Sequence, residues 1–77
     1  MISLKQIRAA RGLLGWTQKD LADQSGLSIR AINRLECGDA NARSSTINLI
    51  QLTLEKNGVI FFNKRGYVGV KIKEEQD

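Results

Sequence analysis

The chain has 77 residues, 42% of them hydrophobic, and a net charge of +4, which predicts one folded domain with a preference for a polyanionic partner. One cysteine and no histidine exclude an internal disulfide framework, argue against a zinc site and favour a cytoplasmic location. Because no apolar run approaches the roughly 18 residues that span a bilayer and the start lacks a signal-peptide pattern, we expect no membrane association.

The first expected helix begins after a Ser3 cap and runs to about Leu14, where Gly15 closes it. Leu4, Ile7 and Leu14 recur at helical spacing and form an apolar face. We therefore expect this helix to pack along one side against the rest of the domain.

Residues 17–36 predict two short helices joined by a tight turn. Thr17 and Ser28 can each cap a helix, because a hydroxyl oxygen accepts a hydrogen bond from an unpaired N–H of the first turn. Gly26 stands where the chain must turn sharply, and a residue without Cβ does so at least strain. The pattern is a helix-turn-helix whose second helix, residues 28–36, is basic and is expected to be the recognition helix. The expected core positions of the motif are Leu21, Ala22, Leu27, Ile32 and Leu35.

A fourth helix is expected to begin after a Ser44 or Ser45 cap and to run to about Asn57, with Gly58 ending it. Its apolar residues form two stripes, which a one-sided surface helix does not need. One stripe should face the helical bundle, and the other is either covered by the C-terminal segment or forms a subunit interface. The first stripe is Ile47, Ile50 and Leu54, and the second is Leu49 and Leu52.

The C-terminal residues change to the alternating pattern of a β-hairpin. Residues 59–62 and 67–73 are the expected strands, residues 63–66 the turn, and residues 74–77 a frayed acidic end. A two-stranded hairpin is marginally stable alone, so it should pack on the helices, pair with a second copy, or both. The expected dimer interface therefore combines Leu49 and Leu52 with the hairpin residues Val59, Phe61, Val68 and Val70.

The cations of the second motif helix suit DNA recognition, because an α-helix fits the major groove. Arg30 and Arg34 are four residues apart and share one face, and an arginine can bond guanine through two parallel hydrogen bonds. Asn33 offers the equivalent pairing with adenine. The N–H groups at the start of the helix that begins with Gln18 suit a phosphate. Lys19 and Arg43 are further phosphate candidates; the alternative for every one of these cations is an ordinary solvated surface charge.

The cap, turn and core residues together resemble the helix-turn-helix of lambda-type phage repressors, Cro proteins and the wider XRE group of bacterial regulators. The resemblance covers about residues 4–57, and the tail resembles that of small stand-alone XRE-type regulators. It implies a compact helical domain that binds duplex DNA as a dimer with the second motif helix in the major groove. The residues that carry it are Thr17-Gln18, Leu21-Ala22, Gly26-Leu27-Ser28, Ile32, Leu35-Glu36 and Gly38.

Carried over by position, the resemblance implies a phosphate contact for Gln18 and a structural ion pair between Arg11 and Glu36. It also implies base and phosphate contacts from Ser28, Ile29, Arg30 and Arg34, with Asn33 nearby. Many relatives have a polar residue where this chain has Ile29, which would instead contact a thymine methyl group. The loop after the motif often contains proline in relatives, whereas this chain has none.

The resulting prediction is a mainly α single domain over residues 1–77: a four-helix, repressor-like bundle (3–57) followed by a β-hairpin (58–73). We expect a sequence-specific transcriptional regulator, a repressor that binds a palindromic operator in double-stranded DNA as a homodimer. The alternatives are an XRE-type antitoxin, which binds a toxin and represses its own operon, and a protein-interaction adaptor that never meets DNA. The sequence contains no glycine-rich phosphate loop and no nucleophile–base constellation, so we expect no enzymatic activity and no cofactor or metal.

Overall fold

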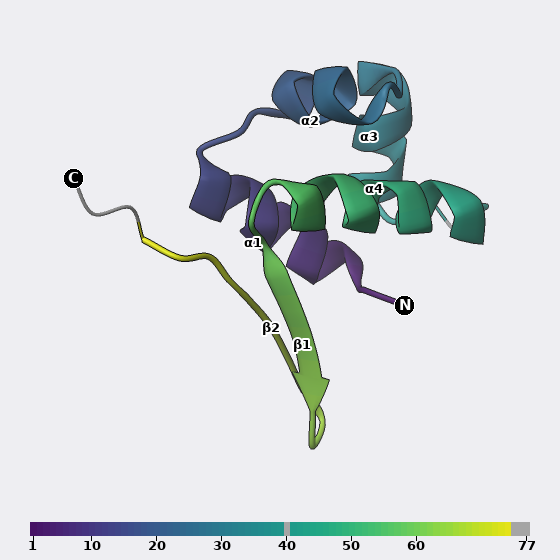
Figure 1. The fold of residues 1–77 in the computed structure, drawn as a ribbon. Helices are drawn as coiled ribbons and strands as arrows, with labels where there is room; N and C mark the ends of the chain where they lie inside the picture. The colour runs from purple at the N-terminus through teal and green to yellow at the C-terminus, as the bar shows by residue number, and fades with distance from the viewer. Residues whose placement is uncertain (40, 75–77) are drawn as a thin grey trace.

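The computed structural model describes residues 1–39 and 41–74, which form four helices followed by two strands. The helices are α1 (Leu4–Leu14), α2 (Gln18–Ser25), α3 (Ile29–Glu36) and α4 (Ser44–Lys56), and the strands are β1 (Ile60–Lys64) and β2 (Tyr67–Lys71). Helices α2 and α3 lie together at one end, α1 and α4 form the middle, and the hairpin projects from the other end (Figure 1). The predicted mainly α fold with a C-terminal hairpin is confirmed. Of the predicted frayed end, residues 75–77 lie outside the described residues.

The first two helices begin where their caps predict. The Ser3 hydroxyl accepts a bond from the Gln6 backbone, and the Gln6 side chain accepts one in return from the Ser3 N–H. Thr17 and Asp20 form the same reciprocal box at the start of α2. Gly15 ends α1 in the left-handed conformation at φ 70°. No helix in the described part of the chain has both the length and the apolar character required to cross a lipid bilayer.

The predicted serine cap of α4 is wrong. The N-cap is Arg43, whose extended backbone (φ −76°, ψ 144°) places its carbonyl to accept bonds from the N–H groups of Thr46 and Ile47. Ser44 is already the first helical residue, and no side chain bonds to the first turn. The helix forms without a side-chain cap because burial of its core stripe stabilises it, and tertiary burial outweighs capping in most protein helices.

The core joins all four helices to the start of the hairpin. Its fully buried members include Ile50 and Leu54 of α4, which confirms the stripe predicted to face the bundle. On the other side of α4, Leu49 and Leu52 remain 39% and 64% exposed, so the hairpin does not cover them. Leu27 is half-buried at the edge of the core. The buried apolar residues are Ile7, Ala10, Leu21, Ala22, Ile32, Leu35, Ile50, Leu54 and Val59.

The hairpin packs its inner face on the helices of its own chain. Phe61 pairs with Val70 across the two antiparallel strands, and both pack against the core. Val59 is only 2% exposed, so its predicted place at a subunit interface is wrong. Burying a valine side chain within its own chain stabilises the fold by about 1.5–3 kcal/mol, and no surface of Val59 is left for a second copy. Val68 alone of the four hairpin residues predicted at the interface stays well exposed.

A buried glutamine connects α1 to both strands. The Gln6 amide nitrogen donates to the carbonyl oxygen of Phe62 at 3.1 Å and to that of Gly69 at 3.0 Å. These two residues face each other across the hairpin, so one side chain holds both strands at the same point. The Phe62 ring lies over Gly69, where an added Cβ would come within 2.3 Å of the ring. The hairpin is therefore attached to α1 by hydrogen bonds as well as by apolar packing.

Candidate nucleic-acid interface

The turn between α2 and α3 sets the direction of the second helix. Gly26 adopts φ 76°, and its N–H and that of Leu27 both donate to the Ala22 carbonyl. The Ser28 hydroxyl then accepts a bond from the Ala31 N–H at 3.0 Å, which begins α3. The predicted turn and cap of the motif are both present.

Helix α3 is buried on one side and open on the other. Ile32 and Leu35 belong to the core, whereas Arg30, Asn33 and Arg34 are exposed. Ile29, at the start of the helix, has 52% of its surface exposed, which is a high value for a large apolar side chain. The exposed face thus presents two guanidinium groups, one amide and one aliphatic side chain, the groups that can contact base edges in the major groove.

The far end of α3 is held by a bidentate ion pair. The Arg11 Nε and Nη2 donate to the two carboxylate oxygens of Glu36, each at 2.7 Å, and Glu36 is 6% exposed. The third donor, Nη1, bonds to the Trp16 carbonyl oxygen at 2.9 Å. The hydrogen bonds that Arg11 donates to Glu36 raise the pKa of the Arg11 guanidinium more than burial lowers it. The pair neutralises the one acid of α3 and joins that helix to α1.

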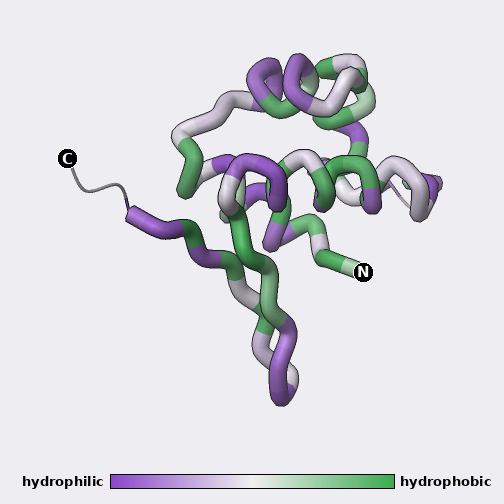
Figure 2. The backbone as a smooth tube through the Cα atoms, viewed as in Figure 1, coloured by the Kyte–Doolittle hydropathy of each residue, from purple (hydrophilic) through white to green (hydrophobic). Residues whose placement is uncertain are grey.

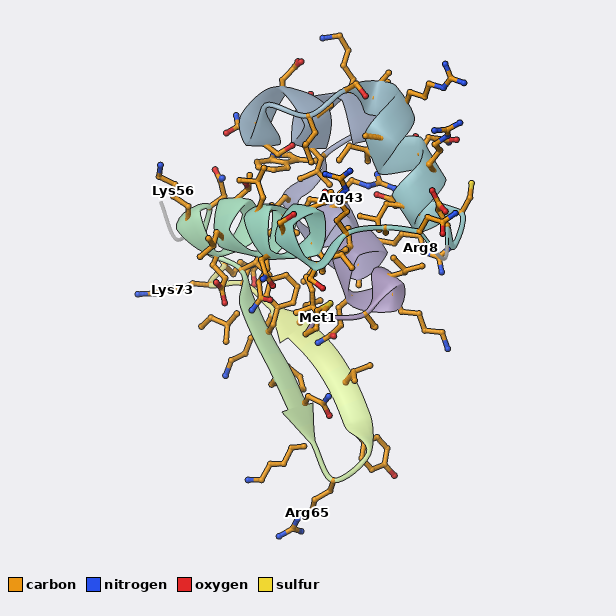
Figure 3. All side chains as sticks on the ribbon, turned by 90° about the vertical axis from the view of Figure 1, so that its right-hand side faces the viewer. Met1, Arg8, Arg43, Lys56, Arg65 and Lys73 are labelled. Atoms are coloured by element: carbon orange, nitrogen blue, oxygen red, sulfur yellow. The ribbon has the colours of Figure 1, made fainter. Side chains whose placement is uncertain are left out.

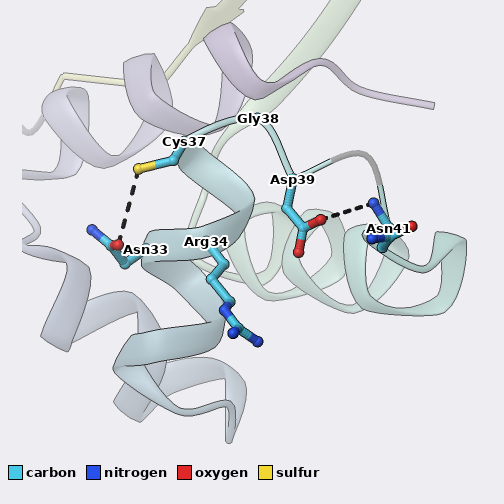
Figure 4. A pocket seen from close by; sticks show the side chains of 6 residues that line it. All are labelled: Asn33, Arg34, Cys37, Gly38, Asp39 and Asn41. Atoms are coloured by element: carbon cyan, nitrogen blue, oxygen red, sulfur yellow. Dashed lines mark hydrogen bonds between the residues drawn. The ribbon is translucent and has the colours of Figure 1, made fainter.

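Gln18 and Asn33 extend this pair across the motif. The Gln18 amide nitrogen donates to Glu36 Oε1 at 3.3 Å, and its oxygen accepts from Asn33 Nδ2, also at 3.3 Å. Asn33 in turn accepts a weak bond from the Cys37 Sγ at 3.9 Å. Figure 4 shows Asn33 facing Cys37, while Arg34 extends from a different side of the helix. Asn33 is therefore engaged within the protein, and Arg34 is free to meet a ligand.

The predicted flanking cations occupy different settings. Lys19 forms an exposed ion pair with Asp23 at 2.9 Å, and this carboxylate raises the pKa of the lysine. Arg43 is exposed at the start of α4 and is labelled in Figure 3. Neither is joined to α3 by a hydrogen bond among the described residues, so the structure does not combine them with the α3 face.

Two cations on α1 were not singled out from the sequence. Lys5 and Arg8 are both exposed, and they precede Arg11 at intervals of three residues, so each is a neighbour of the next on the helix surface and the three form a row that winds along α1. Figure 3 shows Arg8 on the same side of the molecule as α3. The three-residue spacing was visible in the sequence, but only the contact between Arg11 and α3 shows which way this side faces.

The helical part of the chain matches the sequence model of a known protein family. The family described as Helix-turn-helix matches residues 7–57, from within α1 to the residue after α4, and the match ends before the hairpin. A search of curated proteins found no match to the chain. The matched segment contains the α2–α3 motif, the Arg11–Glu36 pair and the exposed face of α3.

Proposed function

We propose that this chain, which belongs to the XRE-type helix-turn-helix family of DNA-binding transcriptional regulators, is a sequence-specific repressor that binds a palindromic operator as a homodimer. The observation that best supports this proposal is the exposed face of α3, which carries Arg30 and Arg34 while its one acid is neutralised by Arg11. A helix end held by that ion pair presents the two arginines in a defined direction. Arginine side chains must point in a fixed direction to distinguish one base from another, but not to be attracted to phosphates in general.

In this proposal α3 enters the major groove with its first turns against the base edges. Arg30 and Arg34 bond guanines, and Ile29 packs against a thymine methyl group. Gln18 and Ser28, at the starts of α2 and α3, contact phosphates that position the motif on the duplex. Asn33 supports Gln18 instead of reading adenine, because its amide already bonds to the Gln18 oxygen. Repression follows where the operator overlaps the site at which transcription begins.

Selection of bound sequences from a pool of random duplexes tests this function directly. We expect a consensus with two inverted half-sites centred about 34 Å, or one helical turn, apart, because each copy of α3 reads one half-site. Guanines should occupy the positions that Arg30 and Arg34 reach. Enrichment of a single unrepeated half-site would contradict the dimer, and failure to enrich any sequence would contradict sequence-specific recognition.

The proposed dimer interface lies on the open side of α4. Leu49 and Leu52 remain exposed there and line a groove with residues of α2 that include Gln24 and Ser25. A chain this short buries a limited core, so pairing these leucines with those of a second copy adds stability that one domain lacks. A two-fold arrangement makes the same patch self-complementary. With Val59 in its own core, the exposed leucines of α4 are the best-placed of the residues expected at the interface.

A Leu52→Glu substitution should convert the dimer into a monomer. The side chain is 64% exposed, so the folded monomer should lose less than about 0.5 kcal/mol, whereas two facing carboxylates would repel each other in the dimer. Light scattering after size-exclusion chromatography measures the mass. Ser44→Glu, at the exposed first residue of the same helix and outside the groove that Leu49 and Leu52 line, is the matched control and should remain a dimer. A monomeric wild-type protein at micromolar concentration would rule out the dimer.

A further inference from the structure

The outer face of the hairpin combines apolar and basic side chains. Cross-strand partners lie on the same face of a two-stranded sheet, and the register pairs Ile60 with Lys71 and Lys64 with Tyr67. All four are exposed, in contrast to Phe61 and Val70 of the inner face. Lysines and aromatic side chains together suit a sugar–phosphate backbone, since lysine binds phosphate and tyrosine can donate to it. Lys64 and Lys71 of this face form no ion pair within the part of the chain that the structure describes.

The hairpin carries a concentrated positive charge. Between residues 60 and 73 the chain has four basic residues, Lys64, Arg65, Lys71 and Lys73, and its first acidic residue after them is Glu74, beyond the end of β2. Figure 2 shows that the hairpin is apolar where it meets the helices and hydrophilic at its tip. A second copy of this face would bring like charges together, whereas a polyanion would complement them. The charge pattern thus favours phosphate over self-association at this face.

The turn holds one of these charges in an unfavourable backbone conformation. Arg65 adopts φ 53° and Gly66 φ 81°, so both central residues of the turn are left-handed. Turns of this kind favour Asn-Gly or Asp-Gly, because asparagine and aspartate tolerate the left-handed region better than other residues that carry a Cβ. An arginine is therefore placed at the tip where a less strained residue would suffice for folding.

The surface of α1 links this tip to α3. Arg8 and Lys5 lead from the Arg11–Glu36 pair towards Gln6, which binds the hairpin, and Figure 3 shows Arg8 on the side of α3 and Arg65 at the far tip. The molecule is 38 Å in its longest dimension, slightly more than one turn of B-DNA, which is about 34 Å. A body of this length that occupies one groove with α3 can reach backbone about a turn away.

We infer that the hairpin is a second DNA contact, which binds the phosphate backbone of the same duplex beyond the base pairs that α3 contacts. Gln6 and the inner-face packing hold the hairpin at a constant position relative to the motif, so the two contacts act as one rigid surface. The hairpin adds affinity without reading sequence, because its charges meet phosphates and not base edges. This inference rests on the DNA-binding role of the family and not on the repressor or dimer proposals.

The test removes the hairpin charges and measures the salt dependence of binding. The triple variant Lys64→Gln, Arg65→Asn, Lys71→Gln should fold, because all three residues are exposed and asparagine suits the left-handed position. Fluorescence anisotropy is measured on the selected consensus duplex with about ten extra base pairs at each end and on the same duplex trimmed to the consensus. On the longer duplex, the slope of log affinity against log salt should fall in magnitude by about 0.9 for each phosphate that the variant no longer neutralises. On the trimmed duplex, variant and wild type should agree.

Single substitutions give a matched control. Lys64→Gln should lower the slope, whereas Lys56→Gln, on the opposite side of the molecule from Arg8 in Figure 3, should leave it unchanged. Equal slopes for the triple variant and wild type on the longer duplex would overturn the contact, as would equal losses on both duplexes. Recruitment of a second labelled duplex by the hairpin would overturn the assignment to the same duplex. If selection yields no consensus, sequence-specific recognition fails, while a mixed-sequence duplex of about 40 base pairs still tests the hairpin by its salt slope.

Discussion

Replacing Glu36 with alanine should lower the free energy of unfolding by about 3 kcal/mol, because the Arg11 guanidinium is then left without its bidentate partner in a largely buried setting. Gln18 is also deprived of its hydrogen bond to the same carboxylate. A domain of this size has a total stability of about 4–11 kcal/mol, so the loss is a large fraction of the whole. In thermal unfolding it corresponds to a decrease in Tm of about 12–24 °C. Urea unfolding followed by circular dichroism measures the change.

The control for this effect is the exposed ion pair on α2. Asp23→Ala breaks the Lys19–Asp23 pair, whose two side chains are 72% and 64% exposed, and should change stability by less than about 0.5 kcal/mol. The comparison separates the effect of burial from that of charge alone. A loss below about 1 kcal/mol for Glu36→Ala would mean that water compensates Arg11, and the pair would not be a main support of α3.

Arg30→Ala should weaken binding to the selected consensus by about 5- to 150-fold, which corresponds to the 1–3 kcal/mol of one bidentate arginine–guanine pair. Binding to random duplex should weaken far less, because only a phosphate attraction is removed there. Arg34→Ala should behave in the same way and relax the consensus at a different base pair. Anisotropy titrations on both duplexes at one salt concentration measure the ratio of affinities.

Arg43→Ala provides the comparison for a charge that does not read bases. It should reduce affinity for consensus and random duplex by similar factors and lower the salt slope by about 0.9 if it contacts a phosphate. The decisive quantity is the ratio of the two losses, since all cations attract DNA. Should Arg30→Ala weaken both duplexes equally, Arg30 would be a phosphate contact and specificity would reside elsewhere on α3.

The internal bonds of the motif assign different roles to neighbouring side chains of α3. Asn33 and Arg34 are adjacent and both exposed, yet Asn33 bonds to Gln18 whereas Arg34 extends away from that contact. Gln18 in turn donates to the Glu36 carboxylate, so α2 and α3 are joined at the residue for which we propose a phosphate contact. A network of this kind restricts the rotation of Gln18 before DNA arrives, which lowers the ordering cost of binding.

Much of the helical part of the fold was predictable because its signals are local. The caps at Ser3, Thr17 and Ser28 act through hydrogen bonds to residues three positions away. Gly26 is favoured because its own turn requires a left-handed backbone conformation. These interactions exist within a few residues, so sequence spacing reveals them. The cap of α4 was mispredicted because two serines gave a strong local signal, whereas the helix begins after Arg43 with no side-chain cap and is stabilised by burial of Ile50 and Leu54.

The candidate site was only partly predictable. Arg30 and Arg34 were identified by their spacing, and the structure places both on the open side of α3. The Arg11–Glu36 pair joins residues 25 positions apart, and only the resemblance to a family indicated it. Arg8 could not be identified from the sequence, because its role depends on which other helix lies next to its side of α1.

The sequence by itself determined the helix-turn-helix: its caps, its turn, its core positions and the basic residues of α3 all follow from interactions within one or two helical turns. Only the tertiary structure decided how the hairpin is used. The Gln6 bonds to the hairpin span 56 and 63 residues, and burial of Val59 removes it from any surface. Alternation in a strand shows that two faces differ but not which face meets the core, because that depends on non-local packing. The face with Phe61 and Val70 packs against the core, and Lys64 and Lys71 therefore lie on the outward face.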